Sequence, residues 1–123
     1  RFIVYYDVDD SLMDYKVFRL MLQPLIENSI HHGVRSLGST GYIKLKIFPL
    51  DGKIHFHVID TGAGMDPEEV QSLRARIADG NSKSIGLTNV NRRLVIKYGP
   101  DSGLVIRSKK GLGTSVSFAI PIP

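Results

Sequence analysis

The stretch Leu22-Gln23-Pro24-Leu25-Ile26-Glu27-Asn28-Ser29-Ile30-His31-His32-Gly33 decides the fold of this chain. Successive residues of a helix are rotated by about 100°, so residues three or four positions apart share a face. One face of this helix is apolar and must dock on a core, and it consists of Leu22, Leu25, Ile26, Ser29 and Ile30. The opposite face is polar and consists of Gln23, Glu27, Asn28 and His31.

The polar face of this helix carries side chains with a short reach that are typical ligands. An exposed helix face is more often rich in lysine and glutamate, which pair along the helix. Asn28 offers a neutral oxygen that suits magnesium, and Glu27 could polarise a nucleophile near a terminal phosphate. Taken alone, the segment also fits a solvated helix that ends in a histidine, which suits the helix dipole.

A second motif follows a predicted strand. Residues 53–60 alternate between apolar and polar side chains, so Asp60 should stand where the strand ends and the chain turns. Gly62 and Gly64 come next, and glycine lets the backbone approach a ligand closely or take a positive φ. A carboxylate at this place can accept a hydrogen bond from an exocyclic amine such as that of adenine. The alternative is an ordinary Asp-Gly turn, because Asp-x-Gly-x-Gly is common.

Two further glycine motifs complete the pattern. Gly86 marks the N-terminus of a predicted helix, where unpaired N–H groups and the helix dipole favour phosphate. Residues 111–120 are a glycine turn that enters an alternating strand, and this strand could bring Thr114 beside Asp60. The apolar residues that follow Gly86 at helical spacing are Leu87, Val90 and Leu94.

In this order the four motifs resemble those of the GHKL ATPases, the superfamily of gyrase B, MutL, heat-shock chaperones and sensor histidine kinases. The resemblance spans nearly the whole chain and looks like the LytS/YesM-type bacterial histidine kinases. It implies that ATP and magnesium are the cofactors, that Glu27 is catalytic and that Asn28 holds the metal. The nucleotide-binding residues that it implies are Asn28, His31, His32, Asp60, Gly62, Gly64, Met65, Ser84, Ile85, Gly86, Leu87 and Thr114.

Two residues depart from the family pattern. His31 stands where the family usually has a phosphate-contacting lysine, and Ser84 replaces the first glycine of a Gly-x-Gly pair. The unperturbed pKa of histidine is about 6.5, so at neutral pH an imidazole is a mostly uncharged substitute for an ammonium group. The affinity of this domain for the terminal phosphates of ATP should therefore be weaker than is usual in the family.

The predicted fold is a single α+β domain, a two-layer sandwich with a mixed sheet of about five strands covered on one face by about three helices. Pro24 should delay the regular part of the first helix. Residues 65–85, with a short helix from about Pro67, should form a mobile lid, because 78–83 offer few apolar anchors. The predicted strands are 2–8, 41–49, 53–60, 103–109 and 113–120, and the predicted long helices are 17–33 and 86–98.

Composition is consistent with this interpretation. The chain has 123 residues, no cysteine, no apolar run that approaches a membrane span and a modest net charge of +4. These features exclude disulfides and thiolate metal sites and argue against nucleic-acid binding or membrane contact by the domain itself. The chain starts abruptly in a β-like stretch, so we expect a C-terminal fragment of a longer protein, located in the cytoplasm and anchored in the bacterial membrane through its other parts.

The expected function is that of the ATP-binding catalytic domain of a two-component sensor histidine kinase. It would transfer the γ-phosphoryl of Mg-ATP to a histidine on a separate dimerisation segment, with a response regulator as the partner of the full-length kinase. His55 and His57 alternate on a strand and are expected to be packing or surface residues rather than acceptors. The alternatives are a GHKL serine kinase of the anti-sigma type and a degenerate nucleotide-binding or docking module.

Overall fold

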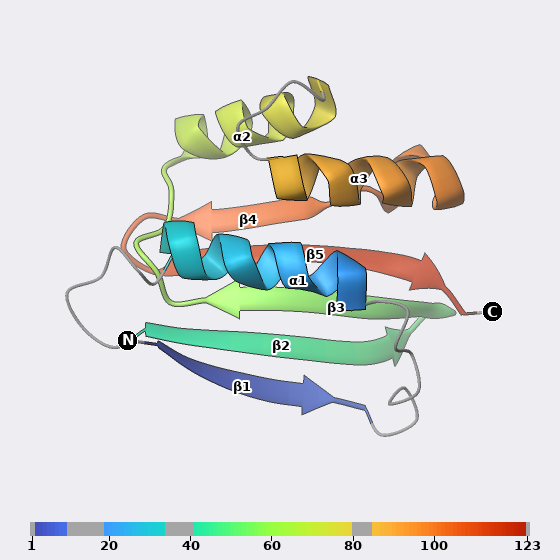
Figure 1. Ribbon diagram of the computed structural model, residues 1–123, viewed down its shortest axis with the longest axis horizontal. Helices are drawn as coiled ribbons and strands as arrows, with labels where there is room; N and C mark the ends of the chain where they lie inside the picture. The colour runs from blue at the N-terminus through green and yellow to red at the C-terminus, as the bar shows by residue number, and fades with distance from the viewer. Residues whose placement is uncertain (1, 10–18, 34–40, 80–84, 123) are drawn as a thin grey trace.

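Five strands form one mixed sheet in the computed structural model, which describes residues 2–9, 19–33, 41–79 and 85–122 (Figure 1). The strand order is β1-β2-β3-β5-β4, with β1 parallel to β2 and every other neighbouring pair antiparallel. A hairpin turn joins β2 to β3 through Asp51 and Gly52, both at positive φ. The strands are β1 (Phe2–Val8), β2 (Gly41–Leu50), β3 (Lys53–Asp60), β4 (Val105–Lys109) and β5 (Gly113–Pro121).

Three α-helices lie over one face of this sheet and leave the other face open (Figure 1). The alternation in β3 explains the two faces, because Ile54, Phe56 and Val58 are buried beneath the helices while the intervening residues point to the open side. This is the predicted two-layer α+β sandwich. The helices are α1 (Arg19–Asn28), α2 (Pro67–Asp79) and α3 (Ile85–Tyr98).

The hydrophobic core fills the space between the helices and the sheet. Leu25 of α1 and Leu94 of α3 have no exposed surface, and the rings of Phe56 and Phe118 stack with their centroids 4.7 Å apart. Burial of such side chains is the main driving force that holds the two layers together. No helix within the described ranges is both long and apolar enough to span a membrane.

The first helix differs from the prediction at Pro24. We expected the regular helix to begin at this residue, but α1 begins at Arg19 and contains Pro24 in its interior. A β-carbon on Gly86 of α3 would lie 3.3 Å from the Cβ of Pro24, so the proline packs tightly where α3 begins. Tertiary packing has therefore overridden a local preference against proline. After Asn28 the α-helix gives way to a π-helical turn, Ser29–Gly33, and residues 17 and 18 lie outside the described part of the chain.

The helix expected from about Pro67 is present but is longer than predicted, so the loop-rich character expected of the lid was wrong for its first part. The segment after Pro67 forms the 13-residue helix α2, which buries Val70, Leu73 and Ile77 in the core. The Arg74 guanidinium also donates a hydrogen bond to the carbonyl of Ile106 in β4. An i, i+3, i+7 apolar stripe in this helix was present in the sequence and accounts for its length. The part of the predicted lid at 80–84 lies outside the described residues.

The fourth strand begins later than predicted, at Val105 instead of residue 103. A short 3₁₀ turn, η5 (Pro100–Ser102), precedes it. The Leu104 amide then donates to the side-chain Oδ1 of Asn91 in α3 at 2.8 Å instead of pairing with β5. An amide that is bonded to a helix side chain cannot contribute to the sheet ladder, so Leu104 is not part of the strand, which starts at Val105.

Candidate active site

Asp60 is the buried acid at the end of β3, and its side chain is only 3 % exposed. Its Oδ1 accepts hydrogen bonds from the Gly62 amide at 2.8 Å and from the Thr114 amide at 3.3 Å. Burial raises the pKa of this carboxyl, while the Gly62 amide, the Ser29 hydroxyl and the Thr114 amide act in the opposite direction. Both amides donate to Oδ1 and so fix the orientation of the carboxyl.

The sheet register explains why Thr114 meets Asp60. The two residues are direct partners in the antiparallel β3–β5 ladder, as the sequence suggested they could be. The contact to Asp60 is made by the Thr114 amide, whereas the Thr114 hydroxyl lies 2.8 Å from the Ser108 hydroxyl. Thr114 therefore positions the acid through its backbone.

Ser29 is a site residue that the sequence analysis missed. It is the first residue of the π-helical turn, is only 1 % exposed, and its Oγ has no hydrogen-bond partner among the described residues. Its hydroxyl faces the Asp60 carboxyl closely enough to lower the pKa of that group. A π-helical turn is frequent at functional sites, and a buried hydroxyl without a partner is what a polar ligand or a bridging water would satisfy. The signal was a lone hydroxyl on an otherwise apolar helix face.

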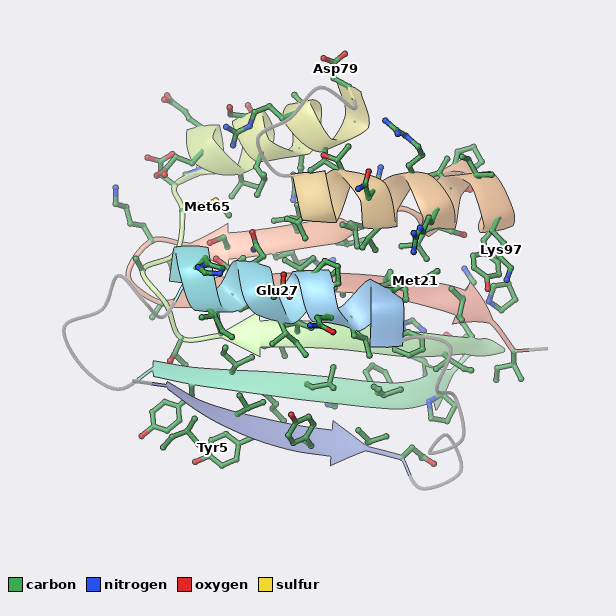
Figure 2. All side chains as sticks on the ribbon, viewed as in Figure 1. Tyr5, Met21, Glu27, Met65, Asp79 and Lys97 are labelled. Atoms are coloured by element: carbon green, nitrogen blue, oxygen red, sulfur yellow. The ribbon has the colours of Figure 1, made fainter. Side chains whose placement is uncertain are left out.

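The polar face of α1 is where the sequence placed it. Glu27 and His31 are exposed, Asn28 is half-buried, and the Gln23 side-chain amide donates to Glu27 Oε1 at 3.2 Å. Figure 2 shows Glu27 on the outward side of α1. The side chain of His32 lies outside the described part of the structure. The helix and the turn that follows it therefore present the side chains of Glu27, Asn28 and His31 close to Ser29 in the sequence.

Ser108 of β4 organises the loop after Asp60 and was also missed. Its Oγ accepts a hydrogen bond from the Met65 amide at 2.8 Å and donates to the Gly113 carbonyl at 2.9 Å. The hydroxyl of Thr114 then donates to Ser108, because the single hydroxyl hydrogen of Ser108 is already used. These bonds tie the predicted nucleotide loop to the turn between β4 and β5.

Two glycines are required for this connection. Gly64 has φ 73°, and a β-carbon there would lie 2.1 Å from the Lys109 carbonyl oxygen. Gly113 has φ 133°, and its β-carbon would lie 1.9 Å from the carbonyl oxygen of Asp60. Both positions exclude any side chain on steric grounds. The Asp-x-Gly-x-Gly motif is therefore more than a surface turn, because its second glycine, Gly64, lies against the end of β4 at Lys109.

The N-terminal end of α3 completes the described part of the site. Gly86 is exposed and lies beside Pro24 of α1, so the start of α3 adjoins the helix that carries Glu27 and Asn28. Leu87 is only 2 % exposed and belongs to the core, which leaves its backbone alone to face a ligand. The side chain of Ile85 and the whole of Ser84 lie outside the described residues.

A metal ion that is bound together with a nucleotide would need few ligands from the protein itself. Within the described ranges, no three histidine, cysteine, aspartate or glutamate side chains are grouped to hold a metal. Magnesium bound to a nucleotide needs only one or two protein oxygens, since phosphates and water supply the rest. Asn28 is half-buried at the end of α1 and carries a neutral amide oxygen.

The two-layer α+β sandwich is that of an ATPase domain family. Residues 13–123 match the model of the family described as histidine kinase-, DNA gyrase B-, and HSP90-like ATPase. The chain belongs to this family, which confirms the resemblance found in the sequence and identifies ATP as the nucleotide.

The chain is similar in sequence to individual sensor histidine kinases. It is 34 % identical to the sensor histidine kinase YpdA of Escherichia coli (strain K12), over 98 % of this chain and 20 % of that protein. It is 30 % identical to the sensor protein LytS of Bacillus cereus, over 93 % of this chain and 20 % of that protein. The chain therefore spans about a fifth of the length of these two relatives.

Solved structures show the same fold. The catalytic domain of the histidine kinase ThkA superposes with a TM-score of 0.70 at 18 % identity, over 98 % of this chain and 78 % of that one. ShkA, solved at full length with AMPPNP, superposes with a TM-score of 0.69 at 22 % identity, over 98 % of this chain and 25 % of ShkA. The five strands and three helices of this chain are thus arranged as in histidine kinase catalytic domains.

Proposed function

We propose that this domain binds Mg-ATP and transfers the γ-phosphoryl group to a histidine on a dimerisation segment outside this chain. The observation that carries the proposal is the Asp60 carboxyl, which is buried and fixed by two backbone amides beside the polar helix α1. We place the adenine at Asp60 and the phosphates along α1 toward the start of α3. Support comes from the family match and from the sensor histidine kinases among its relatives.

Adenine recognition follows from the acceptor chemistry of Asp60. The exocyclic amine of adenine would donate to Oδ2, while the buried Ser29 hydroxyl would bond directly or through a water molecule to a ring nitrogen. Guanine carries an acceptor oxygen where adenine carries the amine, so it would set two acceptors against each other. The pocket should therefore prefer ATP to GTP.

The phosphate end of the nucleotide would lie against the polar face of α1. Asn28 would give an oxygen to magnesium, which neutralises charge on the phosphates when bound. His31 would donate to a phosphate oxygen, more strongly when the imidazole is protonated. Phosphoryl transfer requires mainly positioning and electrostatic stabilisation from the protein. The Gln23 side-chain amide donates to Glu27 Oε1 at 3.2 Å, and this bond would hold Glu27 in a position to polarise the imidazole of the acceptor histidine.

The whole protein would extend this activity to a relay. We place the acceptor histidine on another part of the same polypeptide and a response regulator downstream, as the ThkA structure in complex with the response regulator TrrA suggests for that relative. We also place this domain in the cytoplasm, where ATP is available, with the full-length protein anchored in the bacterial membrane.

Calorimetric titration with ATP tests the proposal, with and without magnesium. We expect saturable binding that is stronger with magnesium, weaker for GTP, and reduced by Asn28→Ala only when magnesium is present. Gln71→Ala, which removes an exposed amide from α2, is the matched control and should bind as the parent does. If ATP binds without any magnesium dependence, or does not bind, the domain is a docking module instead of a kinase.

A further inference from the structure

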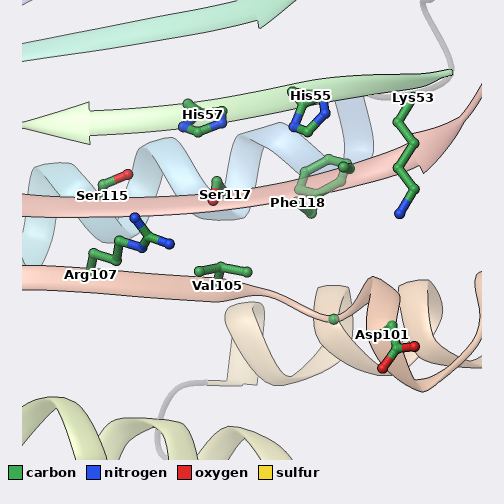
Figure 3. Close-up of a pocket in the computed structure, with 11 residues that line it drawn as sticks. Lys53, His55, His57, Asp101, Val105, Arg107, Ser115, Ser117 and Phe118 are labelled. Atoms are coloured by element: carbon green, nitrogen blue, oxygen red, sulfur yellow. The ribbon is translucent and has the colours of Figure 1, made fainter. Parts of the chain in front are cut away.

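The open face of the sheet carries a groove that the nucleotide site does not use. The outward residues of β5 are small, and they run between the larger side chains of β3 and β4, as Figure 3 shows for Ser115 and Ser117. The cavity has a volume of about 370 Å³. Its floor is Ser115, Ser117 and Ala119, and its walls are Lys53, His55 and His57 on one side and Val105 and Arg107 on the other. We call this cavity the β5 groove.

The β5 groove continues toward the turn between β4 and β5. A second hollow of about 340 Å³ shares Arg107 and Ser115 with it and extends to Lys109 and Leu112. Neighbouring strands lie about 4.8 Å apart, so the backbones of β3 and β4 lie about 10 Å apart on the two sides of β5. That width accepts one extended polypeptide segment. From Gly113 to Ala119 the floor is about 20 Å long, which is the length of about six extended residues.

The walls of the groove carry positive charge that the protein does not neutralise. Lys53, Arg107 and Lys109 are exposed, and within the described ranges none of them makes an ion pair. In contrast, Lys44 lies 3.9 Å from Asp7, and Lys110 lies 3.8 Å from Glu69. Asp101, at one end, is the only carboxylate that lines the β5 groove itself, and the adjoining hollow, to which Lys109 belongs, has Asp60 as its only carboxylate, which is buried. An occupant should therefore be acidic.

The aromatic rings beside the groove argue against a nucleic acid. Phe48 stacks on His55 with centroids 5.2 Å apart and carries the Lys46 ammonium 5.1 Å from its centroid. Bases bind single-strand sites by stacking on free aromatic faces, and these rings already stack on their neighbours.

The spacing of the cations indicates what the acidic occupant looks like. Arg107 and Lys109 are alternate residues of β4, so their side chains lie about 7 Å apart on one face. An extended segment has the same repeat, and carboxylates at every second position would meet both cations. The Ser115 and Ser117 hydroxyls, which have no partner among the described residues, lie on the floor between them. We propose that the β5 groove binds an extended acidic protein segment with carboxylates at alternate positions.

A fluorescent peptide tests this proposal. The probe is a labelled, end-capped heptapeptide in which glutamate alternates with serine, and its control has glutamine in place of every glutamate. Fluorescence anisotropy with the whole domain should show saturable binding of the acidic peptide only, weakening as salt rises. Arg107→Glu should weaken binding by about tenfold or more, whereas Lys97→Glu, the same charge change on exposed α3, should leave it within about twofold.

A second variant separates shape from charge. Ser117→Phe fills the floor of the groove without changing the charge, and its side chain lies on the open face, so the core remains intact. It should abolish peptide binding while ATP binding and the melting temperature stay as in the parent. Binding that persists in both Arg107→Glu and Ser117→Phe would overturn the proposal. Tighter binding of single-stranded DNA or of anionic phosphatidylserine vesicles at the same groove would overturn it as well.

Discussion

Replacing Asp60 with asparagine separates the role of this side chain in the fold from its role in binding ATP. Asparagine has the same shape as aspartate. Its side-chain oxygen can still accept hydrogen bonds from the Gly62 and Thr114 amides, which lie 2.8 Å and 3.3 Å from Asp60 Oδ1 in the parent. The other oxygen becomes an NH₂ group, which would face the amine of adenine donor to donor. Asp60→Ala would instead leave two buried amides without an acceptor and destabilise the site itself.

The size of the effect follows from the hydrogen bond that is lost. A hydrogen bond to a charged acceptor contributes about 1.5–3 kcal/mol, and each 1.4 kcal/mol is a factor of ten in affinity. We therefore expect Asp60→Asn to weaken ATP and ADP binding by about 10- to 150-fold. The empty domain should be at least as stable as the parent at neutral pH, because burial raises the pKa of Asp60 and so disfavours its ionised form.

Calorimetry and thermal denaturation measure these two effects independently. The raised pKa of Asp60 also predicts that ATP affinity falls as the pH falls toward that pKa, above the usual 3.8, and that Asp60→Asn lacks this dependence. Asp79→Asn, at the exposed end of α2, is the matched control and should bind ATP normally. Equal affinity of parent and Asp60→Asn would refute the placement of adenine at this carboxyl.

Three further predictions concern the backbone, the open face and the metal. Gly113→Ala should lower the stability of the domain by about 3 kcal/mol or more, because its Cβ would lie 1.9 Å from the Asp60 carbonyl oxygen. Gly52 also has a positive φ, but no atom lies within 4 Å of the position of its Cβ, so Gly52→Ala should lower the free energy of unfolding in urea by only about 1–2 kcal/mol. Equal losses of stability in Gly113→Ala and Gly52→Ala would disprove the steric argument. The pKa of His57 is lowered below 6.5, first by burial and then by the charges of His55, Lys46 and Arg107. The folded state therefore binds fewer protons than the unfolded state, so the stability of the domain falls as the pH drops below 6.5. His57→Gln should flatten that part of the pH–stability curve, and an unchanged slope would exclude His57 as the cause. Asn28→Ala should leave the melting temperature of the empty domain unchanged; a marked drop would make Asn28 a structural residue.

The fold was predictable because its signals are local. Strict alternation in 53–60 and helical spacing in 22–30 determine which side chains are buried, and Leu25 and Phe56 are indeed in the core. The errors arose where distant contacts decide the outcome. Pro24 lies inside α1 and packs against Gly86, far along the chain, and β4 starts late because Asn91 accepts the hydrogen bond of the Leu104 amide.

The site was predictable only in part for the same reason. Asp60 and the polar face of α1 could be found from their own segments, whereas Ser29 looked like a neutral member of an apolar face. Ser108 acquires its role from Met65, 43 residues away. The sequence indicated that Thr114 could lie beside Asp60, but not that the contact across 54 residues is made by its backbone amide. Hydrogen bonds over such separations depend on the strand register, which a single sequence does not specify.

Phosphoryl transfer to a supplied acceptor tests the central claim most directly. The domain is incubated with γ-labelled Mg-ATP and with the dimerisation segment that we propose for the full-length protein, and acid-labile phosphate is then mapped. We expect label on a histidine of that segment, no label on this chain, and loss of transfer in Asp60→Asn and Asn28→Ala. Stoichiometric phosphohistidine on this chain, or acid-stable phosphoserine on the partner, would contradict the account.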